Sequence, residues 1–251
     1  MMARLSLIFL LVVMLNACGY DGKQVTRIQN RVSEPFIAVE PGEHELGLGG
    51  LLWVNRKPEW KDGLLYIPKA AAAGRPLPLL IWLHGGGGHA EQYRYMFPIA
   101  EELGVVVLSL DARHNTWDGI DSPFGPDVLF IDKAMQHVFD RVHIDPERIA
   151  LGGISDGAAY ALAVGRSNGD VFSHLVAVAP GHLSPPSPPV GKPKIFVGHG
   201  TRDKVYHMTG SRYFIVPDLR DNGYDVTYLE FDGPHWVPAP VARDIMNWLK
   251  R

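Results

Sequence analysis

Short apolar runs alternate with longer amphipathic stretches from about residue 46 to the C-terminus. Several runs are continuous stretches of Val, Ile and Leu, which is typical of parallel strands that helices cover on both faces. The predicted strands are 51–54, 64–67, 79–83, 105–110, 149–151, 175–178, 195–197 and 226–231. The predicted helices lie at about 90–103, 126–142, 156–167, 209–222 and 238–250. This alternation predicts an α/β protein built around a mostly parallel sheet, with helices on both faces.

The pattern extends over one folded domain, which we place at residues 44–251. The chain has 251 residues, of which 46% are hydrophobic, and this is enough for a substantial core. There is no internal repeat. Residues 18–43 are mostly polar at their start, and we expect a tether that leads into the fold.

Residues 1–17 differ from the rest because Arg4 is their only charge and an apolar stretch follows from Leu5 to Leu15. That stretch is shorter than the roughly 20 residues of a spanning helix, so it predicts a signal peptide that is removed on export. The next residues, Leu15 to Cys18, resemble the lipobox of bacterial lipoproteins, whose cysteine is lipidated. Cys18 is the single cysteine and cannot form an internal disulfide. We therefore expect a lipid anchor in the bacterial cell envelope; a plain secretory signal is the alternative.

Charge does not indicate a nucleic-acid partner. The chain has 24 basic and 27 acidic residues, and no Lys/Arg cluster falls on a predicted helix. The sequence gives no indication of the oligomeric state.

A G-x-S-x-G pentapeptide at Gly153–Gly157 is the first candidate for chemistry. It follows the predicted strand 149–151 and begins the helix 156–167, which is the setting of a nucleophile elbow. Its glycines let strand and helix approach closely while the hydroxyl of Ser155 stays accessible. Ser155 is therefore the candidate nucleophile, and the alternative is a glycine-rich turn with an incidental serine.

A second glycine cluster, His84–Gly88, follows the strand 79–83 and is similar to the HGGG-type segment that forms half of an oxyanion hole. Glycines suit this site because backbone N–H groups must converge on a developing oxyanion. We expect the N–H groups of Gly86 and Asp156 to be the donors and His84 to be structural. A phosphate-binding loop is the alternative, but the lysine of a Walker motif is missing.

The remaining members of a triad follow later in the chain. Asp203 comes after the strand 195–197, and His235 lies between the last strand and the last helix. The order Ser155, Asp203, His235 is characteristic of α/β-hydrolases. The competing acids are Asp225 and Asp232. Three further histidines have minor expected roles, with His199 and His207 stabilising the loop of the acid and His114 facing the substrate.

From about residue 60 onward the chain resembles secreted esterases related to polyhydroxybutyrate depolymerases and feruloyl esterases. The closest parts are 127–131, 144–149 leading into Gly153–Gly157, 197–203, and the loop that bears His235. The resemblance implies the α/β-hydrolase fold and hydrolysis of small-molecule or polymeric carboxylic esters through an acyl-enzyme, without metal or cofactor. The cysteine pairs common in that family are missing here.

Two other functions stay open: a serine peptidase of the prolyl-oligopeptidase kind, and a surface lipoprotein that uses the fold only for binding. The connection Ala179–Lys194 is rich in proline and has no room for a lid helix pair, so we expect an open site without a large cap domain. Its wall would come from Asp111–Pro126, with Trp117 and Phe124 as an aromatic shelf.

Overall fold

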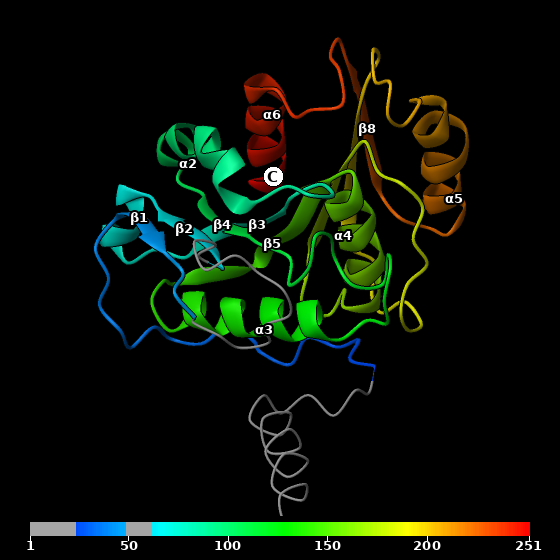
Figure 1. The fold of residues 1–251 in the computed structure, drawn as a ribbon. Coiled ribbons are helices and arrows are strands. Elements are labelled where there is room, and N and C mark those ends of the chain that lie inside the picture. Colours follow the sequence, from blue (N-terminus) through cyan, green and yellow to red (C-terminus); the bar gives the residue numbers. More distant parts are fainter. Residues whose placement is uncertain (1–23, 49–61) are drawn as a thin grey trace, which may run out of the picture.

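The computed structural model describes residues 24–48 and 62–251 of the chain (Figure 1). The expected signal peptide, the anchor at Cys18 and the predicted strand 51–54 lie outside the described residues.

The strands of the described residues form one sheet of eight strands in the order β1-β2-β4-β3-β5-β6-β7-β8. The pairs from β4 through to β8 are parallel, and β2 is antiparallel to both β1 and β4. The strands are β1 Gly42–Glu45, β2 Gly63–Ile67, β3 Leu77–Leu83, β4 Val106–Leu110, β5 Ile144–Ile154, β6 His174–Val178, β7 Lys194–Gly200 and β8 Val226–Phe231. The mostly parallel sheet that the sequence predicts is confirmed.

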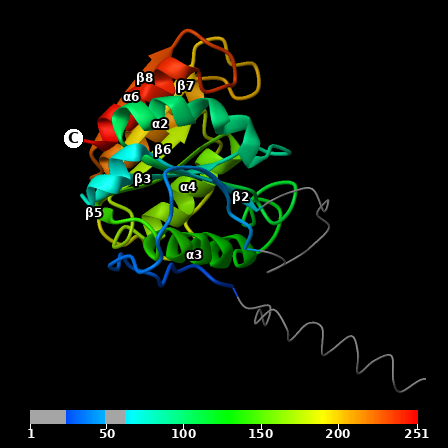
Figure 2. The ribbon, with the colours of Figure 1, turned by 90° about the vertical axis from the view of Figure 1, so that its left-hand side faces the viewer.

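Helices cover both faces of this sheet, as Figure 2 shows for α2 and α6 on one side and α3 on the other. The helical elements are η1 Lys69–Ala73, η2 Ala90–Met96, α2 Phe97–Leu103, α3 Pro126–Phe139, α4 Asp156–Ser167, the π-turn η3 Ser211–Ile215, α5 Val216–Asp221 and α6 Ala239–Leu249. Each face has its own apolar core. Alternate residues of one strand supply both: Ile81 belongs to the core under α3 and α4, and Trp82 to the core under α2 and α6.

The structure differs from the sequence prediction in several elements; for example, the predicted helix 90–103 is divided into the 3₁₀ helix η2 and the helix α2. Strand β1 begins at Gly42, inside the segment expected as tether. Helix α3 ends at Phe139, although Val142 continues the apolar period and is buried from the turn that follows. The predicted helix 209–222 is divided into the π-turn η3 and the short helix α5. Between β6 and β7 the chain forms no helix, and no cap domain interrupts the described fold.

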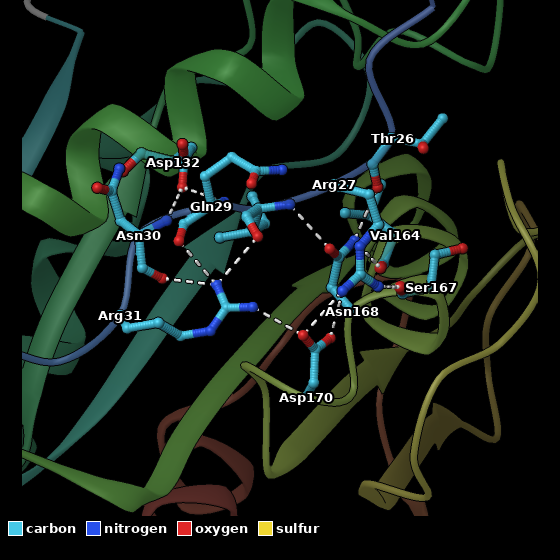
Figure 3. Close-up of polar contacts among 11 residues, drawn as sticks. Thr26, Arg27, Gln29, Asn30, Arg31, Asp132, Val164, Ser167, Asn168 and Asp170 are labelled. Atoms are coloured by element: carbon cyan, nitrogen blue, oxygen red, sulfur yellow. Dashed lines mark hydrogen bonds and ion pairs between the residues drawn. The ribbon is translucent and has the colours of Figure 1, made fainter.

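Residues 24–31 pack along the domain surface next to α3 and the end of α4, as Figure 3 shows. Both Arg27 and Arg31 donate to the carboxylate of Asp170, at 2.8 Å and 2.7 Å. The side chain of Asn168 accepts from the amide of Ile28 at 2.8 Å, and Ile28 is buried in the core. The folded unit therefore includes these residues, which lie before the predicted start of the domain at residue 44.

No helix among the described residues is both long and apolar enough to cross a membrane.

Candidate active site

Ser155 occupies a sharp turn between β5 and α4. Its backbone has φ 56° and ψ −121°, a left-handed conformation that costs a non-glycine residue of order 1–3 kcal/mol. The Ser155 amide donates to the carbonyl of Val178 at 2.9 Å, which fixes the turn on the neighbouring strand. A Cβ on Gly153 would lie 2.6 Å from the carbonyl oxygen of Leu83, so only glycine permits this packing. The sharp strand-to-helix turn that the G-x-S-x-G pattern predicts is present.

The carboxylate of Asp203 lies after β7 and is buried. Its Oδ2 accepts from Nδ1 of His235 at 2.6 Å, and its Oδ1 accepts from the amides of Val205 and Tyr206 at 2.8 Å and 3.0 Å. Burial acts to raise the pKa of Asp203, but the hydrogen bonds from His235 and the two amides outweigh it and hold the pKa below its usual value. The acid is therefore ionised at neutral pH.

An ionised partner at Nδ1 determines the tautomer of His235. Because Nδ1 carries the proton that Asp203 accepts, Nε2 is left with a free lone pair. His235 and Ser155 line the same cavity, of about 460 Å³. No hydrogen bond joins Ser155 to His235 within the described part of the chain, and such bonds are often long in structures without substrate.

The glycine loop 85–88 forms another wall of this cavity. The N–H of Gly87 donates to the carbonyl of Asn115 at 2.7 Å, which leaves it unavailable to a substrate. Asp156 is the first residue of α4, so its N–H has no acceptor within the helix. A Cβ on Gly86 would lie 2.6 Å from Oδ2 of Asp156, so the two expected oxyanion donors belong to residues in close contact.

Thr116 connects these two residues to the loop 111–125. Its hydroxyl donates to Oδ2 of Asp156 at 2.7 Å. The same loop holds His84: the amide of Ala112 donates to Nε2 at 3.0 Å, and the indole of Trp117 donates to the His84 carbonyl at 2.8 Å. His84 is buried and has the structural role expected for it.

The predicted aromatic shelf was wrong. Trp117 is fully buried and Phe124 is 7% exposed, because both side chains pack on Tyr160 in the core. The aromatic side chains that line the cavity are Tyr93, Tyr206 and Trp236. The aliphatic side chain of Val205 lines it as well. The loop 111–125 supports the glycine loop rather than forming the wall of the cavity.

A pair of buried carboxylates, Asp118 and Asp127, holds the loop 111–125. Each accepts a hydrogen bond from the backbone amide of the other, at 2.7 Å and 2.8 Å. Asp127 also accepts from the amide of Arg113, and Asp118 from the hydroxyl of Tyr160. Burial, with the nearby charge of Asp118, raises the pKa of Asp127 to about 7. Burial also raises the pKa of Asp118.

The other candidates lie away from this chemistry. Asp232 is 80% exposed and pairs with Arg202 at 2.7 Å, and Asp225 is exposed, so neither competes with Asp203. His199 bonds the hydroxyl of Ser211 and the carbonyl of Tyr206, both at 2.8 Å, which confirms its loop-stabilising role. His207 bonds the hydroxyl of Thr209, also within its own loop. His114 does not line the cavity, contrary to the prediction.

Among the described residues, no group of three or more His, Cys, Asp and Glu side chains could hold a metal ion.

Some known esterases are similar to this chain in sequence or in fold. No family model matches the chain. Over 152 residues it is 27% identical to the proposed esterase NocK of Nocardia uniformis subsp. tsuyamanensis, covering 56% of this chain and 44% of NocK. Over 106 residues it is 31% identical to an acetylxylan esterase of Coprinopsis cinerea, covering 38% of this chain and 28% of that protein. The crystal structure of esterase PE8 superposes with a TM-score of 0.60 at 19% identity, over 75% of this chain and 97% of PE8.

The chain has the α/β-hydrolase fold. Its matched regions span less than half the length of the two curated relatives. Three residues at or beside the site, Tyr206, Trp236 and Thr116, were not predicted from the sequence. A signal was present for two of them, since Trp236 directly follows His235 and Tyr206 lies three residues after Asp203. Thr116 could not be found, because nothing in the sequence pairs it with Asp156.

Proposed function

We propose that this protein is a serine hydrolase that cleaves carboxylic esters through an acyl-enzyme. The observation that supports the proposal most directly is the 2.6 Å bond from His235 Nδ1 to the buried Asp203, with His235 and Ser155 lining the same cavity. Esterases among the relatives and structural neighbours agree with ester hydrolysis.

In the proposed mechanism, Nε2 of His235 takes the proton of Ser155 as Oγ attacks the ester carbonyl. The N–H groups of Gly86 and Asp156 bind the oxyanion, and loss of one such donor costs about 10²–10³ in turnover. His235 then gives its proton to the departing alcohol. Water repeats the sequence on the acyl-enzyme and releases the acid. Throughout, ionised Asp203 holds the imidazole orientation and stabilises the imidazolium.

For the substrate, we propose short acyl groups on soluble or polymeric alcohols. The cavity has no lid between β6 and β7, and exposed residues form its rim, with Val205 64% and Trp236 38% exposed. Acetyl esters of carbohydrate and esters of the polyhydroxybutyrate or feruloyl type belong to this range. The acetylxylan esterase among the relatives supports the acetyl group.

For location, we propose export and a lipid anchor at Cys18. In Figure 1 the described chain begins below α3, at the end of the domain away from the loop between β8 and α6 that carries His235. An anchor near this end would leave the cavity accessible. Partition of the mature protein into detergent, and its loss in Cys18→Ser, would support the anchor; an unmodified N-terminus by mass spectrometry would exclude it.

A fluorophosphonate probe tests the proposed activity, because only an activated serine reacts with it. We expect covalent labelling of the wild type at Ser155 and none in Ser155→Ala. We expect His235→Ala to lose at least 10³-fold in kcat on 4-nitrophenyl acetate, on the scale known for triad members. An unlabelled, folded wild type would favour the binding lipoprotein, and cleavage of peptides faster than esters would favour the peptidase.

A further inference from the structure

A second cavity, of about 480 Å³, lies beside the active site and has no part in the proposed mechanism. Its floor is one face of α4, where Ala159, Leu162 and Arg166 follow at helical spacing. The opposite wall is the π-turn η3 with α5, and the start of the connection between β6 and β7 closes one end. Figure 1 shows α4 and α5 on the same side of the fold, with this connection near them.

The rim of this cavity carries two large aromatic side chains in an unusual position. Tyr213 is 60% exposed and Phe214 is 72% exposed, and both line the cavity. They belong to a π-turn, a rare element that is frequent at functional sites. Exposed aromatic side chains at a concave surface supply flat apolar faces on which a ligand ring can stack.

Charged groups of both signs lie in the same cavity: Arg166 together with Asp218 and Asp221. The Nε of Arg166 donates to the Leu162 carbonyl at 3.1 Å, and within the described chain its terminal amino groups have no hydrogen-bond partner. The two carboxylates would repel a bound anion, and the guanidinium would repel a bound cation. A wholly apolar ligand would desolvate all three groups without replacing their hydrogen bonds. The complementary ligand is neutral and rich in hydroxyl groups, and has an apolar ring face, which describes a sugar.

Tyr206 separates this cavity from the active site and contacts both. Its ring lies edge to face on His235, with centroids 5.7 Å apart. On the other side, a Cβ on Gly181, which lines the second cavity, would lie 3.4 Å from the Tyr206 hydroxyl. His199 joins Ser211, the first residue of the π-turn, to the Tyr206 carbonyl. Tyr206 therefore lies between His235 of the first cavity and Gly181 of the second, which places the two cavities next to each other.

We propose that the second cavity is a subsite for a neutral sugar unit of a carbohydrate ester whose acyl group is cleaved at Ser155. The proposal rests on the proposed esterase function and adds the class of the alcohol and the residues that recognise it. Tyr213 and Phe214 stack on the ring, and Arg166 and Asp218 bind its hydroxyl groups.

The kinetic test compares Phe214→Ala with Phe36→Ala, a matched control in which an equally exposed phenylalanine (75%) lies outside both cavities. Loss of one stacked ring should raise KM for acetylated xylotetraose about 3- to 10-fold with little change in kcat. Neither variant should change KM or kcat for 4-nitrophenyl acetate, which is too small to reach the subsite. Phe36→Ala should behave as wild type on both substrates. An unchanged KM for the oligosaccharide ester in Phe214→Ala overturns the subsite.

A binding measurement keeps the test independent of turnover. Folded Ser155→Ala should bind unacetylated xylotetraose or cellotetraose by calorimetry, and the additional change Phe214→Ala or Asp218→Asn should weaken binding by a similar 3- to 10-fold. Absence of binding, or equal binding in the double variants, refutes the subsite. Failure of the esterase itself would instead appear as absence of fluorophosphonate labelling, so the two failures are distinguishable.

Discussion

Replacement of Thr116 by valine tests whether the loop 111–125 positions the proposed oxyanion donors. Valine has nearly the shape of threonine but no hydroxyl, so the change removes the 2.7 Å bond to Asp156 Oδ2 and little else. That carboxylate oxygen lies against Gly86. Without its donor, the Asp156 side chain gains freedom at the point where the two N–H groups must converge.

The structure sets the size of the expected effect. A hydrogen bond to a charged group contributes about 1.5–3 kcal/mol, and the half-buried position of Thr116 places it at the low end of that range. About 1.4 kcal/mol of transition-state stabilisation is tenfold in rate, so kcat should fall about tenfold. Loss of a complete oxyanion donor, at about 10²–10³, gives the upper limit. KM should change little, because the oxyanion forms only after binding.

The assay is steady-state hydrolysis of 4-nitrophenyl acetate by wild type, Thr116→Val and Thr116→Ser, with melting temperatures measured on the same samples. Serine keeps the hydroxyl and should restore most of kcat. If Thr116→Val retains kcat within about twofold of wild type, Thr116 does not position the donors. If the serine variant is as slow as the valine variant, the methyl packing and not the hydrogen bond is responsible.

Three further outcomes follow from the structure. The pKa of Asp127 is raised from 3.8 to about 7, so between these values the native state binds more protons than the unfolded state. The contribution of Asp127 to the free energy of unfolding is therefore fully present below pH 3.8 and is lost as the pH rises to about 7. Urea unfolding at pH 5 and pH 8 should show a larger loss for wild type than for Asp127→Asn, and an equal loss would contradict this. Asp170→Asn should speed hydrogen exchange at the amide of Ile28 with a change of less than about 1 kcal/mol in global stability, since the ion pairs are partly exposed. Unchanged exchange would show that the hydrogen bonds of Asn168 and Asp132 hold the segment without the ion pairs. An open cavity should favour acetyl to butyryl esters over chains beyond about eight carbons, without interfacial activation, and a preference for long-chain emulsions would require a lid.

The fold could be predicted because its strands are continuous apolar runs and its connections carry helical periodicity. The proposed triad residues were selected because each follows a strand in the chain order that α/β-hydrolases have, and two of them, Asp203 and His235, lie within hydrogen-bond distance at 2.6 Å. Strand β1 could not be predicted, since Gly42–Glu45 has alternating burial and no apolar run. Periodicity also failed at the end of α3, because Val142 is buried without belonging to the helix.

The incorrect prediction of an aromatic shelf at Trp117 and Phe124 shows why side-chain exposure in a loop is hard to predict from sequence. Trp117 and Phe124 lie in a segment with no periodicity, so their exposure depends on which polar groups the loop can bury. Here Asp118 and Asp127 are buried and accept backbone amides of their own loop, which lets the chain fold inward with Trp117, next to Asp118, and Phe124, between the two carboxylates. Two adjacent carboxylates in a core are unfavourable unless hydrogen-bonded, and no pattern of single residues predicts that they will be. The cavity is lined instead by aromatic residues near the proposed acid and base, Tyr206 and Trp236. The loops that carry the proposed acid and base thus supply two of the three aromatic side chains of the cavity, and Tyr93 of η2 supplies the third, while the loop 111–125 supports the glycine loop from behind.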